Sequence, residues 1–93
     1  MKQIRPYPRL VITKKGTNWV QDGHPWIYEG EVIRTEDPDG TPCDPPKNGS
    51  ICDAVSENGR YLGSGFLSLK SKIRLRIIST NANDRFDEAF FRR

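Results

Sequence analysis

The chain has 93 residues, an apolar content of 34% and a formal net charge of +3. This length favours a single domain with a modest hydrophobic core. No run of residues approaches the ~20 apolar residues of a membrane-spanning helix, and the N-terminus lacks the apolar segment of a signal peptide. We therefore expect a cytoplasmic protein that does not bind a membrane.

The charge is distributed unevenly along the chain. Residues 1–15 carry five cations and no acid, residues 16–57 carry nine acids and two cations, and residues 58–83 again carry five cations and no acid. If the fold brings the two acid-free segments together, a cationic patch forms on a nearly neutral protein. If charges of opposite sign interleave in space, they cancel. The sequence leaves both arrangements open.

The first half of the chain predicts two short strands around one helical turn. Residues 9–12 form a short apolar run and predict a strand, and residues 17–22 predict a short helix that ends at Gly23. Residues 26–33 are rich in aromatic and β-branched side chains and predict a second strand, in which Gly30 indicates a bulge. The helix is therefore expected directly after the first strand.

The second half predicts a hairpin and a further strand. Residues 36–49 contain four prolines and predict a loop. Residues 50–55 and 60–67 predict paired strands, because Asn58-Gly59 between them suits a tight hairpin turn. Residues 71–79 predict the last strand. Five short strands and one helix favour a mainly β fold, either a small barrel of mixed strands or a strongly bent sheet.

The C-terminal residues 83–93 predict about two turns of an amphipathic helix. Phe86, Ala89 and Phe90 have the spacing of an apolar helical stripe. A helix this short is marginal in water unless its apolar stripe packs on something. Either it docks on the barrel or it begins a further domain, and we favour a helix truncated at the end of this chain.

Residues 69–77 alternate with period two, which in a strand places alternate side chains on opposite faces. One face is predicted to enter the core and the other to carry a row of four cations. The predicted core residues are Leu69, Ile73, Leu75 and Ile77, and the cations are Lys70, Lys72, Arg74 and Arg76. Such a row is either a solvated outer face or a platform for a polyanion such as RNA.

Five further residues are candidate ligand contacts. Lys14 and Lys15 precede the predicted helix, where backbone N–H groups favour a phosphate. Trp19 and Trp26 either stack on unpaired bases or belong to the core. His24, the single histidine, either makes a structural hydrogen bond or contacts a ligand.

The sequence contains no recognisable catalytic or metal-binding pattern. Cys43 and Cys52 are nine residues apart, without a nearby histidine, and are predicted to be free thiols rather than zinc ligands. Gly63-Ser64-Gly65 is not followed by a helix, as a phosphate-binding loop would be. We therefore expect a non-catalytic module with no metal and no cofactor of its own.

Residues 14–16, 24–32, 58–65 and 71–76 together carry a family resemblance. The segment of His24, Pro25 and Trp26 is its most specific part. These segments resemble the N-terminal PUA domain of bacterial class I S-adenosylmethionine-dependent rRNA methyltransferases, of the cytosine-C5 type acting on large-subunit rRNA. Residues 87–93 resemble the start of the helix that follows this domain in the family.

The resemblance implies a PUA-like pseudobarrel of five to six short strands with a short helix after the first strand. It implies residues 1–82 as an RNA-binding domain and residues 83–93 as the start of a truncated C-terminal helix leading into a missing methyltransferase region. S-adenosylmethionine and the catalytic cysteine would belong to that missing region, against which the domain packs. Residues 37–46 are longer and more acidic than the family leads us to expect.

In PUA domains the RNA groove lies beside the first helix and the last strand, so the resemblance and the charge pattern indicate the same surface. The candidate RNA contacts are Lys14, Lys15, Trp19, His24, Lys70, Lys72, Arg74 and Arg76. The predicted partner is large-subunit rRNA, held through phosphates for methylation by the missing region. The alternative is an intramolecular or protein-interaction β-barrel module with no RNA affinity of its own.

Overall fold

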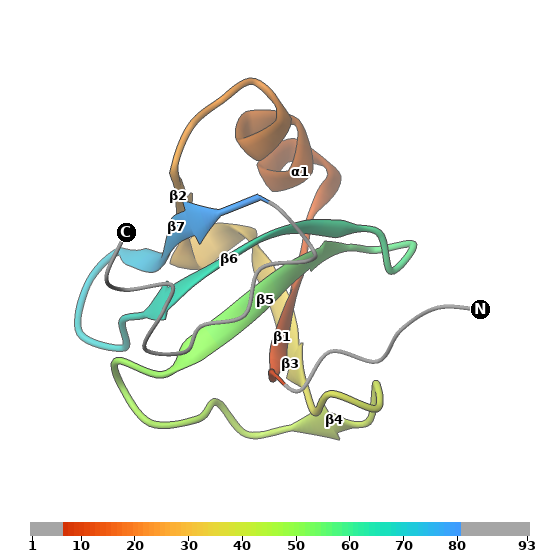
Figure 1. The fold of residues 1–93 in the computed structure, drawn as a ribbon, viewed down its shortest axis with the longest axis vertical. Coiled ribbons are helices and arrows are strands. Elements are labelled where there is room, and N and C mark those ends of the chain that lie inside the picture. Colours follow the sequence, from red (N-terminus) through yellow and green to blue (C-terminus); the bar gives the residue numbers. More distant parts are fainter. Residues whose placement is uncertain (1–6, 81–93) are drawn as a thin grey trace.

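The structure, a computed structural model, describes residues 7–80. Seven strands form one sheet, in the order β2-β7-β6-β5-β1-β3-β4, that curls into a half-barrel (Figure 1). The strands are β1 (Arg9–Ile12), β2 (Trp26–Tyr28), β3 (Val32–Glu36), β4 (Pro42–Cys43), β5 (Ile51–Ser56), β6 (Tyr61–Leu67) and β7 (Ile73–Ser79). Helix α1 (Lys14–Gln21) follows β1, and a 3-10 helix, η1 (Glu29–Glu31), separates β2 from β3. Within residues 7–80, no helix has the length and apolar character needed to cross a bilayer.

The predicted mainly β fold, with one helix after the first strand, is confirmed. The boundaries of that helix are not those predicted. It begins at Lys14 rather than Thr17, because the Thr13 hydroxyl accepts a hydrogen bond from the Gly16 N–H at 3.0 Å and so caps the helix. Gly23 follows the helix with a φ of 101°, in keeping with the predicted end.

The strands also differ in number from the prediction. The single strand predicted at residues 26–33 is two strands, because η1 turns the chain at Gly30 where a bulge was expected. The proline-rich segment contains the short edge strand β4, which pairs with β3. The predicted helix at residues 83–93 lies outside the described residues.

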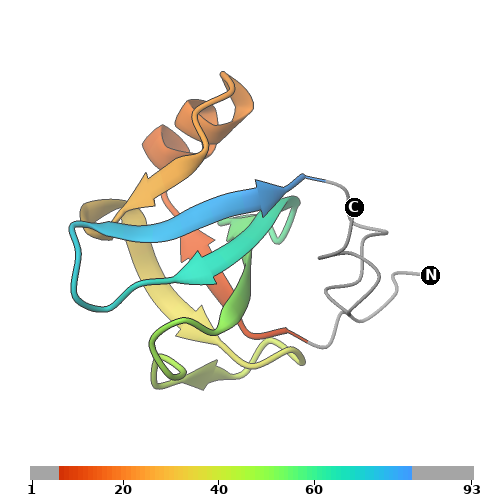
Figure 2. The same cartoon turned by 60° about the vertical axis from the view of Figure 1, so that its left-hand side comes forward.

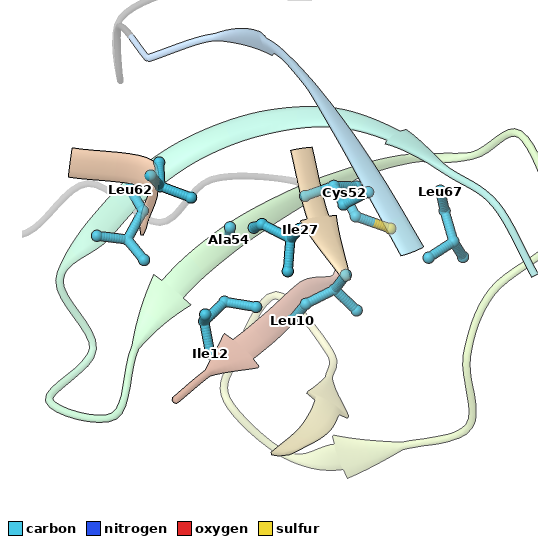
Figure 3. Close-up of a cluster of buried hydrophobic side chains, with 9 residues drawn as sticks. Leu10, Ile12, Ile27, Cys52, Ala54, Leu62 and Leu67 are labelled. Atoms are coloured by element: carbon cyan, nitrogen blue, oxygen red, sulfur yellow. The ribbon is translucent and has the colours of Figure 1, made fainter. Parts of the chain in front are cut away.

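The core lies inside the curl of the sheet, as Figure 3 shows. Its members come from five strands and α1: Leu10, Ile12, Val20, Ile27, Cys52, Ala54, Leu62, Leu67 and Leu75. Each fully buried leucine or isoleucine stabilises the fold by roughly 1.5–3 kcal/mol relative to exposure. Leu75 is fully buried, as its alternation predicted, and Ile77 packs against the cluster. Strands distant in the sequence therefore share one core, which fixes the position of β7.

Leu69 does not belong to this core, contrary to the prediction. It is 39% exposed, in the turn between β6 and β7. That turn is closed by a hydrogen bond of 2.8 Å from the Ser68 N–H to the Arg74 carbonyl. The period-two pattern of the sequence therefore begins before the strand does, at Leu69 rather than at Ile73.

Gly65 lets β6 and β7 approach each other closely. A Cβ at this position would lie 1.7 Å from the carbonyl oxygen of Arg76, and the register of the two strands shifts between Ser64 and Gly65. No side chain fits there without displacing backbone. The hairpin turn predicted at Asn58-Gly59 is also confirmed, because Gly59 has a φ of 84° and joins β5 to β6.

Ser64 belongs to a polar chain in the β5–β6 pair. Its hydroxyl is fully buried, donates to Asp53 Oδ1 at 2.6 Å, and lies 2.6 Å from the Tyr61 hydroxyl. Buried polar groups are costly unless they are hydrogen-bonded, as these are. The Gly63-Ser64-Gly65 segment is thus a structural part of the sheet.

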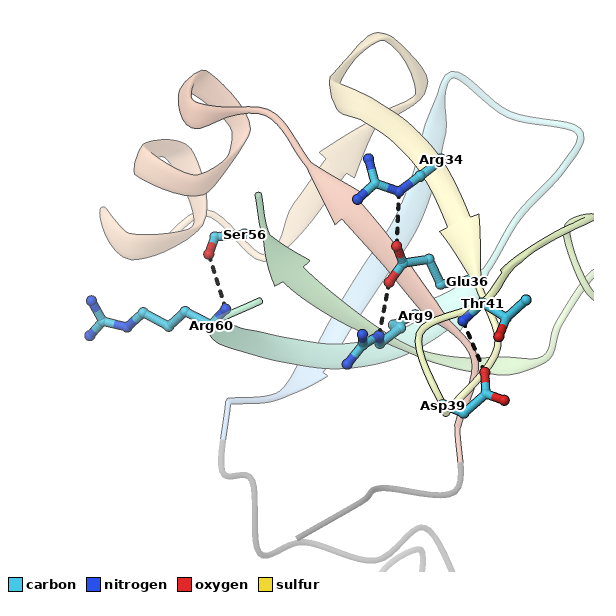
Figure 4. Close-up of polar contacts among 7 residues, drawn as sticks. All are labelled: Arg9, Arg34, Glu36, Asp39, Thr41, Ser56 and Arg60. Carbon is cyan, nitrogen blue, oxygen red and sulfur yellow. Dashed lines mark hydrogen bonds and ion pairs between the residues drawn. The ribbon is translucent and has the colours of Figure 1, made fainter. Parts of the chain in front are cut away.

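Arg9 and Arg34 share one carboxylate, that of Glu36 (Figure 4). The Nε atoms of Arg9 and Arg34 lie 3.1 Å and 2.8 Å from its two oxygens, and the Glu36 side chain is only 8% exposed. A buried carboxylate needs this kind of double hydrogen bonding. The ion triad of Arg9, Glu36 and Arg34 therefore joins β1 to β3.

Candidate nucleic-acid interface

The outer face of β2 and β7 forms the base of the candidate interface. In the antiparallel pair, Trp26 is opposite Arg76 and Ile27 is opposite Leu75. Ile27 and Leu75 point into the core, so their neighbours Trp26 and Arg76 point outward. Tyr28 also points outward and is 44% exposed.

Helix α1 lies beside β2 on the same side of the molecule (Figure 2). Gly16 and Val20 form its buried face, and a Cβ at Gly16 would lie 2.6 Å from Ile12 Cγ2. Because Gly16 has no side chain, the helix can pack closely against the end of β1. Trp19, next to the buried face, stays 37% exposed.

Four aromatic rings connect α1 to β2. Trp19 stacks on His24, with ring centroids 3.6 Å apart and planes 15° from parallel. The Trp19 ring lies 6.4 Å from Tyr28, and the His24 ring lies 6.2 Å from Trp26. His24 therefore supports the Trp19 indole, and the two predicted candidates lie in contact.

Lys14 and Lys15 are exposed in the first turn of α1. The start of this helix already holds a carboxylate, because the Thr13 hydroxyl donates to Glu31 Oε2. Since Thr13 also caps the Gly16 N–H, an incoming phosphate would meet an occupied helix end. Any phosphate contact here is therefore expected from the lysine side chains, not from the backbone amides.

The four predicted cations of the last strand lie in three different environments. Because β7 begins at Ile73, Lys70 and Lys72 are exposed in the preceding turn. Arg74 Nη2 forms an ion pair with Glu29 Oε2 at 2.9 Å. Arg76 is exposed on the strand, opposite Trp26.

The acids of η1 lie between the two cationic segments. The Glu29 N–H donates to the Lys72 carbonyl at 2.8 Å, and the Glu31 carbonyl accepts from the Thr13 N–H at 2.9 Å. The fold thus links both acid-free segments to one short element and interleaves two carboxylates with their cations. Both arrangements that the sequence left open occur, on the same surface.

Tyr28 and Phe66 are two residues of this surface that the sequence did not indicate. Phe66 is opposite Arg76 in the β6–β7 register and is 39% exposed. Phe66, Arg76 and Trp26 therefore form a row across three strands. Only the strand order brings them together, so a pattern within one segment could not reveal the row.

The two thiols are unsuited to nucleophilic chemistry. Burial, with the nearby Asp53, raises the pKa of Cys52 to about 12. Desolvation and the nearby Asp37 also raise the pKa of Cys43. Both thiols are therefore protonated near neutral pH. In the described part of the chain, no group of three or more histidine, cysteine, aspartate or glutamate side chains could hold a metal ion.

Known proteins match this chain over most of its length. It is 34% identical over 87 residues to "Ribosomal RNA large subunit methyltransferase I" of Klebsiella pneumoniae (strain 342), and 33% identical over 87 residues to the protein of that name in Salmonella typhi. Each match covers 94% of this chain but 20% of the relative, so the chain spans about a fifth of the length of these curated relatives. A family model described as a PUA-like domain matches residues 10–80, which include the candidate interface. The chain therefore belongs to the PUA-like domain family.

Proposed function

We propose that this domain binds structured RNA, specifically large-subunit rRNA, mainly through phosphate contacts. The observation that carries the proposal is the gathering of basic side chains from α1, β7 and the turn before β7 around β2 and η1. The proposed phosphate contacts are Lys14, Lys15, Lys70, Lys72, Arg74 and Arg76. Basic side chains grouped on one surface attract a polyanion and set its orientation.

The ion pairs within the domain support this assignment. Among the six proposed contacts, and within the described range, Arg74 alone is held in an ion pair. The other five are exposed, so their charges can meet a phosphate without first breaking a contact. Arg9 and Arg34 are tied to Glu36 and are not proposed as RNA contacts.

The relatives' name suggests the larger setting of the domain. They are named as methyltransferases of large-subunit rRNA, and this chain matches a fifth of their length. We infer that residues 1–82 bind rRNA and residues 83–93 lead into a methyltransferase region. In this proposal S-adenosylmethionine is held by that region of the parent protein, against which the domain packs.

The test is a titration of the 93-residue chain with a labelled rRNA hairpin at several salt concentrations. The logarithm of the affinity should fall linearly with the logarithm of salt concentration, with a slope of about −0.7 to −0.9 per neutralised phosphate. Lys14→Gln with Lys15→Gln should flatten that slope by roughly 1.4–1.8 if each lysine neutralises one phosphate.

Lys47→Gln is a control at a distant site, because it removes one exposed lysine charge away from the proposed interface. Lys47 belongs to the loop of residues 44–50, which lies at the end of the molecule away from α1 (Figures 1 and 2). The salt slope of the Lys47→Gln variant should equal that of the unaltered chain. Absence of binding at the lowest salt concentration would contradict the proposal and favour a protein-interaction module.

A further inference from the structure

Trp19 presents an exposed indole that is already held in place. His24 covers one face of the ring at 3.6 Å, yet 37% of Trp19 stays exposed. Because His24 occupies one face of the indole, a nucleobase could stack only on the opposite face. Exposed aromatic rings bind unpaired nucleobases by stacking, and a ring fixed beforehand loses little freedom on binding.

A cation lies at a suitable spacing from this ring. Lys15 is four residues before Trp19 on α1, which places the two side chains on the same helical face, ~6 Å apart along the axis. A base stacked on Trp19 would therefore have its backbone phosphate within reach of Lys15. Arg76 is opposite Trp26 in the β2–β7 pair. It therefore lies on the other side of the aromatic cluster from Lys15, beyond the rings of His24 and Trp26.

We propose that Trp19 stacks on an unpaired RNA base, with His24 as the positioning residue behind it. The domain would then prefer RNA in which a single-stranded nucleotide adjoins a paired stem. Stem phosphates would meet the cations, and the unpaired base would meet the indole. This inference rests on the proposed RNA binding and adds the class of RNA that the surface recognises.

The experiment compares two RNA hairpins that share one stem and differ by a single unpaired nucleotide in it. The chain should bind the bulged hairpin more tightly. Trp19→Leu should weaken binding of the bulged hairpin by about 5- to 100-fold and leave the paired hairpin unchanged. Ile33→Ala is the control, because Ile33 is another exposed apolar side chain, 44% exposed on β3, and should change neither affinity.

The positioning role of His24 has its own test. His24→Ala should weaken binding of the bulged hairpin, and His24→Phe should restore it, because phenylalanine also presents a flat ring to the indole. Loss of binding to both hairpins in His24→Ala would instead indicate a general structural role. Thermal unfolding of each variant separates lost folding from lost stacking.

Fluorescence gives a second measurement. Trp26→Phe leaves Trp19 as the single tryptophan of the chain, and it removes an Nε1–H that is buried without a hydrogen-bond partner among the described residues. Emission from Trp19 should then be quenched by the bulged hairpin and not by the paired one. Equal binding of both hairpins, unaffected by Trp19→Leu, would overturn the stacking proposal and leave phosphate binding intact. Binding of neither hairpin would contradict the proposed function itself.

Discussion

Within residues 7–80, two glutamates form ion pairs with arginines, in contrasting surroundings. Glu36 has a side chain only 8% exposed and meets both Arg9 and Arg34. Glu29 has a side chain 54% exposed and, among the described residues, forms an ion pair with Arg74 alone. A nearly buried carboxylate held by two cations fixes strands together, whereas an exposed pair contributes little to stability and can rearrange. The same chemistry is thus structural on β1 and β3 and adjustable beside β7.

The side chains around the two pairs extend this difference. Near Glu36, the cations are committed to the fold. Near Glu29 lie Tyr28, which is exposed, and Lys72, whose carbonyl accepts a hydrogen bond from the Glu29 N–H, on the surface proposed to bind RNA. Substitutions on the first side should therefore change the free energy of unfolding, and those on the second should change binding.

The largest expected effect comes from Gly65→Ala, which disrupts the sheet at the contact of β6 with β7. The added methyl would lie 1.7 Å from the Arg76 carbonyl oxygen, so β6 and β7 must separate. We expect a loss of roughly 3–5 kcal/mol in the free energy of unfolding, measured by urea denaturation. Gly30→Ala is the control, because a Cβ there meets nothing within 4 Å, and its change should stay near zero.

Glu36→Gln should have the next largest effect. The amide keeps the shape of the side chain but leaves two arginines without their counter-charge. Removing a charged hydrogen-bond acceptor from a nearly buried site costs roughly 1–3 kcal/mol, which urea denaturation would measure. RNA affinity should not change. A reduced affinity in a folded Glu36→Gln variant would contradict the division between the two regions.

Cys52 should make the free energy of unfolding fall at alkaline pH. Its pKa is raised from 9.0 to about 12 in the fold, so the protonated thiol favours folding. The stabilisation is fully present below pH 9 and is lost as the pH rises toward 12, by at most ~1.4 kcal/mol per pH unit. Urea unfolding from pH 7 to 10.5 should show a steeper decline for the unaltered chain than for Cys52→Ala. Equal slopes would exclude the thiol as the cause.

The sequence predicted most of the fold because its signals are local. The hairpin at Asn58-Gly59 and the burial of Leu75 follow from turn chemistry and alternation. The start of α1 does not follow from local signals, because Thr13, Thr17 and Asn18 are all acceptable N-cap residues. Only the contact with Glu31 distinguishes Thr13. The turn at η1 was missed for a related reason, since a glycine in an apolar run equally predicts a bulge.

The candidate site was less predictable, because long-range pairing assembles it. Lys15, Trp19 and Arg76 could each be named from charge or aromatic character, but their shared surface depends on β2 pairing with β7. The ion pair between Glu29 and Arg74 joins residues 45 positions apart. No pattern within a segment encodes such a contact, so the interleaved acids appear only in the structure.

Glu29→Gln should have the smallest effect on stability. Unlike the lysine substitutions, it should raise the RNA affinity. The pair is exposed, so its loss should change the free energy of unfolding by less than ~1 kcal/mol. Arg74 is then free to meet a phosphate, and one repelling charge is gone, so RNA affinity should rise about 2- to 5-fold at low salt and the salt slope should steepen by up to ~0.9. Glu57→Gln, at an exposed acid in the β5–β6 turn, makes the same change in net charge and is the control. If both variants raise the affinity equally, the gain reflects net charge alone, and the ion pair with Glu29 does not keep Arg74 from binding a phosphate.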